Sequence, residues 1–321
     1  MLPQIDQLVA AIERNRIRKL ALISSGRLSS PGTMKPTLSF DVEDSGSEPG
    51  TVHNDDCWGS VATAAWILDG ATGLSKKRLL PSASTDAQWF VRAVDIELRN
   101  ADWSEPTETL LRSALQRVNG RFRNEARGTL EQALWPFASF ALIRALNDHI
   151  EFVNLGDCRI LWKRRDFGGV KSFGSSRVTE LDSNVVNEIK RLHRGGTTNN
   201  EVVWEIISPI IQANRDLKNR PGGYWILDIA GDGLDHLQKM ELDPSDIDKV
   251  LLCTDGYYRL VDTYLTRTVD SLLEDSMDLG IASTIRSIRE IERADDRCLS
   301  FPRIKSSDDA TGVLVVVRRG Q

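Results

Sequence analysis

The sequence lacks any long hydrophobic run. A membrane-spanning helix needs roughly 18 consecutive apolar residues, and the richest stretch, WPFASFALIRAL, is interrupted by Arg144. The first residues, MLPQIDQLVAAIERNRIRKLALI, carry charge throughout, which a secretory signal does not. We therefore expect a cytoplasmic protein that is not bound to a membrane.

Cysteine and histidine are also scarce, with four of each. The cysteines form no CxxC motif and no Cys/His pair: Cys57, Cys158, Cys253 and Cys298. Scattered thiols predict a reduced compartment and argue against zinc. His149, His193 and His236 lie in charged or loop stretches and GxSxG is absent, which argues against a Ser-His-Asp hydrolase. The Walker and GxGxxG nucleotide motifs are absent too.

The composition is that of a soluble globular protein. Of 321 residues, 40% are hydrophobic and 27% are charged, and the length suits one large domain or two ordinary ones. The net charge of -5 argues against a dedicated nucleic-acid binder, which usually carries a basic stripe. A local basic patch for an anionic substrate stays compatible with this charge.

The N-terminal part differs from the rest of the chain. An amphipathic helix over residues 3–20 is predicted from apolar residues at helical spacing: Ile5, Leu8, Val9 and Ile12. Residues 26–50 are rich in Gly, Ser and Pro, which predicts a loop or linker with at most one short strand. We divide the chain into an N-terminal helix and linker, residues 1–35, and a main domain, residues 36–321.

The main domain mixes short strands with long helices and lacks the regular βαβα alternation of a doubly wound sheet, which favours an α+β layered sandwich. Helical patterns cover residues 84–123, the region after 128, and residues 179–193, 199–218 and 265–293. Strands are predicted in VATAAWILDG, GGYWILDI, LLCTDG and TGVLVVVRR, and HIEFVNLGDCRILWKR reads as a hairpin. FGGVKSFGSS is predicted to be a loop or hairpin tip.

Aspartates recur at the edges of apolar runs. They lie in HNDDCWG (Asp55, Asp56), WILDGATG (Asp69), VNLGDCRIL (Asp157), LLCTDG (Asp255) and SSDDATGVLVVV (Asp308, Asp309). One Asp-Gly at a strand end is usually a turn, but five such motifs indicate a carboxylate cluster. Like charges a few Å apart resist ionising together, and Mg²⁺ or Mn²⁺ relieve this with oxygen ligands. Neighbouring glycines let the backbone approach an ion closely.

In their order and spacing, GTVHNDD, WILDGATG, LGDCRIL, LLCTDG and DDATGVLVVV resemble the motifs of the metal-dependent Ser/Thr protein phosphatases of type 2C. The resemblance runs from about residue 45 to 318, and it is to bacterial members of the family. It implies a four-layer α-β-β-α sandwich, in which two antiparallel β-sheets pack face to face and helices cover both outer sides. It also implies two Mn²⁺ or Mg²⁺ ions at one end of the sandwich.

The same resemblance implies the ligands of each ion, because residues of this chain stand at the positions of the family's ligands. Asp69 would bridge both ions and Gly70 would offer its carbonyl. Asp255 and Asp308 would complete one shell, while Asp55 would hold the other ion, directly or through water. Asp56 would take part beside Asp55, and Asp157 would lie near a third, weaker metal position shared with Asp255.

The implied chemistry is hydrolysis of phosphoserine or phosphothreonine in a protein by a metal-activated water. Asp69 and Asp255 are the residues on which catalysis would depend, and no covalent phosphoenzyme is needed. The ions would also offset charge on the phosphoryl oxygens in the transition state. A phosphorylated protein is the implied partner, and no regulatory partner is indicated.

The chain departs from the family pattern at several positions. Where many members carry an arginine that grips phosphate, this sequence has Thr51. The grip then falls to the metals, to His53, or to the basic run Lys76-Lys77-Arg78, which as a run is more often a solvated loop.

Two further departures lie beside the implied ligands. Ala71 replaces a histidine that acts as an acid in some members, although bacterial members often lack it. Asp309 stands where asparagine is usual and adds a charge, while Thr311 keeps its family place.

Three functions remain open at this point. The first is an active protein phosphatase, which the retained Asp69, Asp255 and Asp308 favour. The second is a pseudophosphatase that serves as a binding or regulatory module, which Thr51 and Ala71 favour. The third is a phosphatase for a small metabolite, which the sequence does not separate from the first, because substrate choice depends on the loops around 165–180 and 193–200.

Overall fold

The structure is a computed structural model, and it describes residues 38–71, 78–128, 131–164, 168–174 and 177–320. The helix predicted over 3–20 and Lys76 and Lys77 of the basic run lie outside these residues. Residues 36–321 form one compact unit. None of the helices in the described part of the chain combines the length and apolarity needed to cross a bilayer.

The strands form two sheets in which neighbouring strands are antiparallel. The first sheet has the order β1 (Leu38–Glu48), β11 (Ala310–Arg319), β10 (Ile247–Cys253), β6 (Arg159–Arg164) and β7 (Lys171–Phe173). The second has the order β2 (Asp56–Val61), β3 (Ala64–Ala71), β4 (Phe137–Ala145), β5 (Ile150–Leu155) and β9 (Gln238–Leu242), with β8 (Leu227–Asp228) paired to β4.

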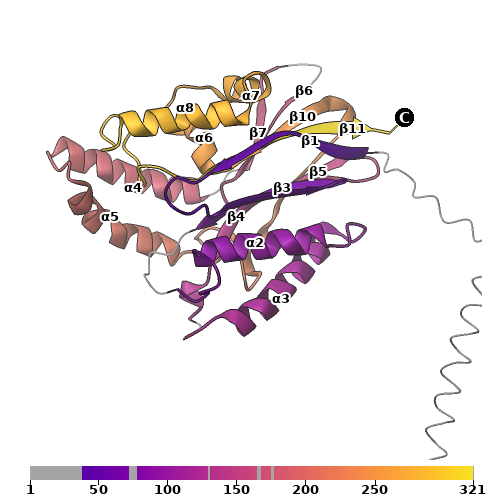
Figure 1. The fold of residues 1–321 in the computed structure, drawn as a ribbon, viewed down its shortest axis with the longest axis horizontal. Helices are drawn as coiled ribbons and strands as arrows, with labels where there is room; N and C mark the ends of the chain where they lie inside the picture. Colours follow the sequence, from indigo (N-terminus) through magenta and orange to yellow (C-terminus); the bar gives the residue numbers. More distant parts are fainter. Residues whose placement is uncertain (1–37, 72–77, 129–130, 165–167, 175–176, 321) are drawn as a thin grey trace, which may run out of the picture. The chain divides into compact units, whose positions relative to one another are not determined.

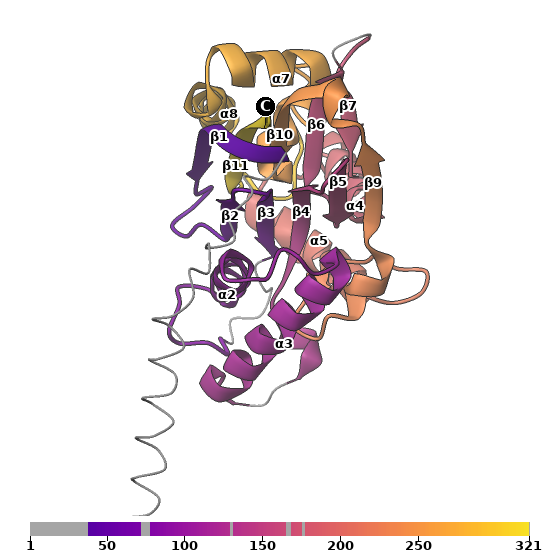
Figure 2. The same cartoon turned by 90° about the vertical axis from the view of Figure 1, so that its right-hand side faces the viewer.

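Helices cover the outer face of each sheet, and the two sheets lie between them (Figures 1 and 2). On the second sheet lie α2 (Asp86–Arg99) and α3 (Thr107–Glu125); on the first lie α6 (Asp255–Asp262), α7 (Val269–Asp278) and α8 (Ile281–Ala294). The predicted four-layer α-β-β-α sandwich is confirmed. Short 3-10 helices occur at η1 (Gln132–Leu134), η2 (Asp232–His236) and η3 (Pro244–Asp246).

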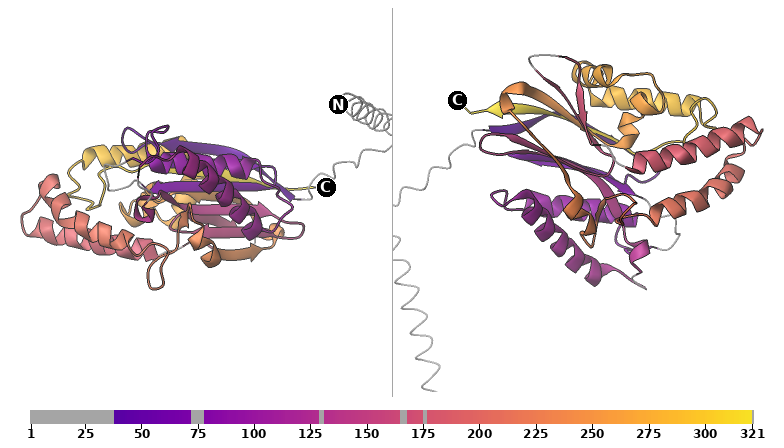
Figure 3. Two further views of the ribbon diagram at one scale, coloured as in Figure 1. Left: turned by 90° about the horizontal axis from the view of Figure 1, so that it is seen from below. Right: turned by 180° about the vertical axis from the view of Figure 1, so that it is seen from behind.

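A helix pair, α4 (Arg177–Arg194) and α5 (Asn200–Arg215), extends from one end of the sandwich (Figure 3). Its members bury a small apolar cluster against each other: Val185, Ile189, Leu192, Val203, Ile207 and Ile211. The helices predicted over 179–193 and 199–218 are therefore confirmed.

Alternation along each strand explains the layers. On β3, Ile67 packs between the sheets, whereas Trp66 and Leu68 pack under α2 and α3. On β10, Leu252 faces the second sheet and Leu251 faces the helices of the other side. Because side chains alternate between the two faces of a strand, a strand covered on both faces is apolar throughout. This accounts for the continuous apolar runs that precede Asp69 and Asp255.

The helix predicted after residue 128 is wrong. The chain there forms η1 and then β4, whose nine residues are all buried at the centre of the second sheet. A strand buried on both faces has no polar alternation, so its apolar run has the same pattern as a buried helix. The predicted helical stretches 84–123 and 265–293 are helical in the structure, but each consists of two helices. The first is interrupted before α3, near Pro106, and the second before α8, near Gly280.

The predicted hairpin in HIEFVNLGDCRILWKR is also wrong, although both of its strands exist. β5 belongs to the second sheet and β6 to the first, so the turn between them crosses the sandwich. Gly156 in this turn has φ 104°, and a Cβ there would lie 2.4 Å from Ser139 Oγ. Only glycine fits this left-handed and crowded position. The turn therefore delivers Asp157 to the junction between the sheets.

Two other strands differ in length from their prediction. β1 runs for eleven residues along β11, inside the stretch predicted to be a linker with at most one short strand. It is an edge strand with many partly exposed residues, so its sequence carries little hydrophobic signal. The GGYWILDI strand is reduced to the two residues of β8, while β7 occupies part of the predicted FGGVKSFGSS loop.

Candidate functional site

Aspartates from both sheets meet at one end of the sandwich. Asp56 begins β2 and Asp69 lies near the end of β3; Asp157 follows β5, Asp255 begins α6, and Asp308 precedes β11. Asp56 and Asp69 are direct partners in the β2–β3 register. Burial raises the pKa of Asp69 well above its usual value, and nearby carboxylates add to the effect: Asp255, Asp56, Asp157 and Asp308. Asp69 and these four aspartates of the predicted cluster are thus electrostatic neighbours.

The Asp56 carboxyl is buried and only half satisfied. Its Oδ2 accepts hydrogen bonds from Thr311 Oγ1 at 2.7 Å and from Thr254 Oγ1 at 3.0 Å. Its Oδ1 is buried with no hydrogen-bond partner. Burial and the charge of Asp309 raise the pKa of Asp56, and the two threonine hydroxyls oppose this rise. An unpartnered buried carboxyl oxygen is costly, so this atom is suited to receive a cation.

Asp55 points its carboxylate in a different direction. It accepts a hydrogen bond from the hydroxyl of Thr85, the residue that caps the N-terminus of α2. The Asp55 backbone N–H donates to Asp309 Oδ2 at 2.6 Å, and its carbonyl accepts from Gly70 N–H at 3.1 Å. Of these two adjacent acids, Asp56 is therefore the one that pairs with Asp69 across β2 and β3. The sequence had predicted Asp55 as the principal ligand.

Asp157 is held by Ser139, whose hydroxyl donates to Asp157 Oδ1. Burial and the charge of Asp255 raise the pKa of Asp157 to about 6, although the Ser139 hydrogen bond opposes the rise. Ser139 lies on β4, which carries no motif in the sequence analysis. The structure thus adds Ser139 to the residues that position the cluster.

Asp308 differs from the other carboxylates because two cations contact it. Arg259 Nη2 lies 2.6 Å from Asp308 Oδ2, and Lys305 Nζ lies 2.7 Å from Asp308 Oδ1. Burial opposes its ionisation, but Lys305 and Arg259 outweigh burial and lower the pKa of Asp308. Both oxygens already accept charged hydrogen bonds, so an ion at Asp308 would have to share them.

Asp309 organises the loop before β2. Its carboxylate accepts hydrogen bonds from the backbone N–H groups of Gly50, at 2.8 Å, and of Asp55. Its carbonyl oxygen would lie 2.0 Å from a Cβ added to Gly256, so the Asp-Gly at the start of α6 is required for this close approach. The departure from the usual asparagine is therefore accommodated by backbone donors.

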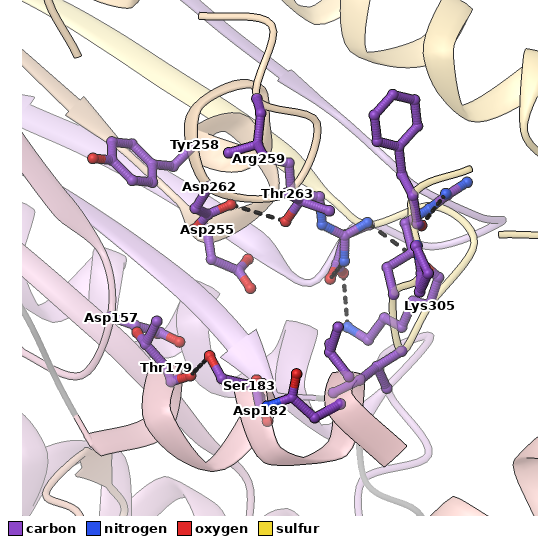
Figure 4. Close-up of a pocket in the computed structure, with 18 of the residues that line it drawn as sticks. Asp157, Thr179, Asp182, Ser183, Asp255, Tyr258, Arg259, Asp262, Thr263 and Lys305 are labelled. Carbon is purple, nitrogen blue, oxygen red and sulfur yellow. Dashed lines mark hydrogen bonds and ion pairs between the residues drawn. The ribbon is translucent and has the colours of Figure 1, made fainter. Parts of the chain in front are cut away.

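A cavity of about 570 Å³ opens beside the cluster, between α4, α6 and the segment 300–308 (Figure 4). Asp157, Asp255 and Asp308 line one part of it, and Asp182 of α4 lies across from them. Burial and the charges of Asp157 and Asp255 raise the pKa of Asp182 to about 7. The cavity is thus acidic on both walls, and Lys305 and Arg259 supply positive charge at its side.

Of the residues predicted to grip phosphate, the two that the structure describes, His53 and Arg78, do not line this cavity. His53 and Arg78 line a separate, shallow hollow with Gln88 and Arg92 of α2. Thr51 is exposed, and Ala71 lines a third cavity beside Phe137. Arg259 and Lys305 were not among the predicted site residues; the one sequence signal for Arg259 is its place three residues after the Asp255-Gly256 motif.

The aspartate carboxylates of the cluster fit a hard divalent cation, because their donor atoms are oxygens and because a positive charge would offset their mutual repulsion. Asp56 Oδ1, buried without a partner, is the structural observation that supports this fit. Within the residues that the structure describes, no three His, Cys, Asp or Glu side chains are already arranged as a metal-binding group. Side chains of the cluster would therefore have to turn towards a shared ion.

The fold and the site together define a class of protein: four-layer sandwiches in which both sheets contribute aspartates at their strand ends. The sequence model of the family described as Protein phosphatase 2C matches residues 45–287. The chain therefore belongs to the protein phosphatase 2C family. No curated protein matches the sequence.

Several solved structures of bacterial phosphatases are similar to the chain. The Mycobacterium tuberculosis serine/threonine phosphatase PstP shares 17% identity over 87% of this chain and 98% of its own, with a TM-score of 0.47. PppA, described as a key regulatory component of T6SS in Pseudomonas aeruginosa, shares 19% over 88% and 100%, with a TM-score of 0.49. Stp1 from Staphylococcus aureus shares 15% over 91% and 99%, with a TM-score of 0.43.

Proposed function

We propose that the chain is a Mn²⁺- or Mg²⁺-dependent phosphatase that hydrolyses phosphoserine and phosphothreonine in proteins. The observation that carries the proposal is the meeting of Asp56, Asp69, Asp157 and Asp255 beside an open cavity, with Asp56 Oδ1 buried and unpartnered. Membership of the protein phosphatase 2C family supports the same activity. The cytoplasmic location stays a prediction.

Under this proposal, Asp69, Asp56, Asp255 and Asp157 would hold the ions, together with the carbonyl of Gly70. Asp308 would contribute through oxygens that it shares with cations. The position that the sequence analysis gave to Asp55 passes to Asp56, because Asp56 is the strand partner of Asp69. Bound Mn²⁺ or Mg²⁺ would offset charge on the phosphoryl oxygens and make a water acidic enough to ionise near neutral pH.

The chain's own residues would orient the donors and keep competing chemistry out. Thr254 and Thr311 would hold Oδ2 of Asp56 and leave Oδ1 without a hydrogen-bond partner, free to bind an ion. Burial raises the pKa of the Cys158 and Cys253 thiols, so neither thiol is a ready nucleophile. Attack by water without a covalent enzyme intermediate is therefore the chemistry that these residues favour.

One observation favours a second candidate, a binding or regulatory module without catalysis. Arg259 and Lys305 already neutralise Asp308, which reduces the need for an ion at that carboxylate. A chain that had lost its ions would retain such a pairing and the sandwich around it.

Hydrolysis of p-nitrophenyl phosphate and of a phosphothreonine peptide tests the proposal, with Mn²⁺, with Mg²⁺ and with EDTA. Asp69→Asn and Asp255→Asn run beside the wild type. Turnover that requires metal and vanishes in both variants supports the phosphatase, and a preference for the peptide separates protein from metabolite substrates. Folded wild type without turnover at any metal concentration contradicts it, and a Mn²⁺ titration then shows whether the module still binds ions.

A further inference from the structure

The cations beside the cavity differ in how firmly they are held. Arg303 is buried and donates to Asp295 Oδ2 at 2.7 Å and to the Asp295 carbonyl at 2.7 Å. Arg259 is buried between Asp308 and Glu292, whose Oε1 lies 3.5 Å from Arg259 Nη1. Neither guanidinium has the freedom to follow a substrate.

Arg159 is another arginine that lines this cavity, and it too is engaged. It donates to the carbonyl of Gly174, and its guanidinium lies 5.4 Å from the centre of the Tyr258 ring. A stacked and hydrogen-bonded arginine forms part of the wall. Two lysines line the cavity as well, Lys190 of α4 and Lys305 of the segment 300–308, and one of them is a flexible cation in contact with the carboxylate cluster.

Lys305 is that cation. Its side chain is 47% exposed at the cavity, and its ammonium contacts Asp308 Oδ1 at 2.7 Å. Asp308 already has Arg259 as a partner, so the second positive charge exceeds what one carboxylate needs. An ammonium carries three N–H donors. The hydrogen bond to Asp308 uses one of them. Lys305 lines the same cavity as Asp255 and Asp157 (Figure 4).

We propose that Lys305 grips the phosphoryl group of the substrate, in place of the arginine that is missing at Thr51. This inference rests on the proposed phosphatase function and adds the residue that positions its substrate. Lys305 shares the cavity with the carboxylates, whereas His53 and Arg78 line another hollow. Its flexible stem lets the ammonium move from Asp308 to an incoming dianion, and Arg259 stays behind to neutralise Asp308.

The test compares Lys305→Met and Lys305→Arg with the wild type at saturating Mn²⁺. Calorimetric binding of inorganic phosphate is measured first, and then KM and kcat for p-nitrophenyl phosphate. Because a hydrogen bond between charged groups is lost, we expect Lys305→Met to weaken phosphate binding and to raise KM about 10- to 100-fold. We expect kcat to change little and Lys305→Arg to recover most of the loss.

Lys249→Met is the matched control. Lys249 is also a partly exposed lysine that pairs with a carboxylate, Glu43 Oε2 at 2.7 Å, but it lies on β10 and does not line the cavity. We expect it to bind phosphate as the wild type does. A Mn²⁺ titration of each variant verifies equal loading, which separates loss of phosphate contact from loss of metal.

Two outcomes overturn the role of Lys305: phosphate binding that is equal in wild type and Lys305→Met, or a loss that Lys305→Arg does not reduce. Failure of the proposed function looks different. A wild type that binds phosphate but shows no turnover contradicts the phosphatase, while the binding comparison between wild type and Lys305→Met still decides the role of Lys305.

Discussion

Asp56 and Asp69 lie directly opposite each other on β2 and β3, so the register of two strands brings together a buried carboxyl, that of Asp56, and a partly buried one, that of Asp69. Side chains of directly opposed residues are close neighbours on one face of a sheet. Asp55, one residue earlier, points instead to Thr85 at the start of α2. The two adjacent acids therefore have separable roles that substitution can distinguish.

We expect Asp56→Asn to abolish Mn²⁺-dependent turnover, by at least about 100-fold, and to weaken Mn²⁺ binding. The metal-free variant is expected to be as stable as the wild type or more stable, because a like charge is removed. Asp55→Asn is expected to retain Mn²⁺ binding and to lose about 1 kcal/mol of stability with the weakened helix cap. Calorimetric Mn²⁺ titration and thermal melts measure both variants. If Asp55→Asn loses Mn²⁺ and Asp56→Asn keeps it, our assignment is reversed.

Stability of the metal-free protein is expected to fall as the pH rises from 5 to 8. Asp56, Asp69, Asp157 and Asp182 have pKa values raised in the folded state, Asp157 to about 6 and Asp182 to about 7. Well below the ordinary aspartate pKa of 3.8, these carboxyls hold protons in both states. As the pH rises from 3.8 through the raised folded-state pKa values, the unfolded chain has released these protons while the folded chain still holds them, which favours unfolding.

The pKa of Asp157 is raised from 3.8 to about 6 in the folded state. This shift alone lowers the free energy of unfolding above pH 7 by on the order of 3 kcal/mol, relative to its value at low pH. We therefore expect the Tm in EDTA to drop by roughly 5 °C or more across this range, measured by calorimetry. Asp157→Asn should show a smaller drop, and Mn²⁺ should restore the Tm at pH 8. A Tm that rises from pH 5 to pH 8 in EDTA is the contrary result.

Gly156→Ala is expected to destabilise the protein by roughly 2–4 kcal/mol. The φ of Gly156 is 104°, and the added Cβ would lie 2.4 Å from Ser139 Oγ, which also holds Asp157. Gly196→Ala is the control, because its φ is 89° but no atom lies within 4 Å of the added Cβ. It should lose only about 1 kcal/mol. Urea denaturation of both variants gives the comparison, and equal losses would show that the contact with Ser139 is unimportant.

Arg303→Met is expected to destabilise the protein by about 3–5 kcal/mol, because it leaves Asp295 as a buried carboxylate without its cation. Arg303 also donates to the carbonyls of Phe301 and Ser306, so it anchors the segment that carries Lys305. Chemical denaturation measures the loss. The double variant Arg303→Met with Asp295→Leu should recover part of it, and no recovery would argue against the buried ion pair as the cause.

The sequence predicted the strand ends well, because a strand covered on both faces is an unbroken apolar run and its end is marked by Asp-Gly. It therefore placed Asp69 near the end of a strand and Asp255 directly after one, where α6 begins. The same property misled the prediction after residue 128, because β4 is buried on both faces. A short apolar run does not distinguish a central strand from a buried helix.

What the sequence did not contain is the pairing of distant elements. Whether Asp55 or Asp56 faces Asp69 depends on strand register, and a shift of one residue exchanges the two faces. Whether the turn at Asp157 closes a hairpin or crosses between sheets depends on the partner strands β4 and β10. The cations at Asp308 were hidden for the same reason, because Arg259 is 49 residues from Asp308 along the chain.

The turn that crosses from β5 to β6 has a consequence for the whole sandwich. Because Asp69 belongs to one sheet, Asp255 follows a strand of the other, and Asp157 lies on the crossing between them, any ion that they share would clasp the two layers together. Ligands that bind only the folded state stabilise it by mass action. The supply of divalent ions would then set how long the folded molecule survives, as well as how fast it works.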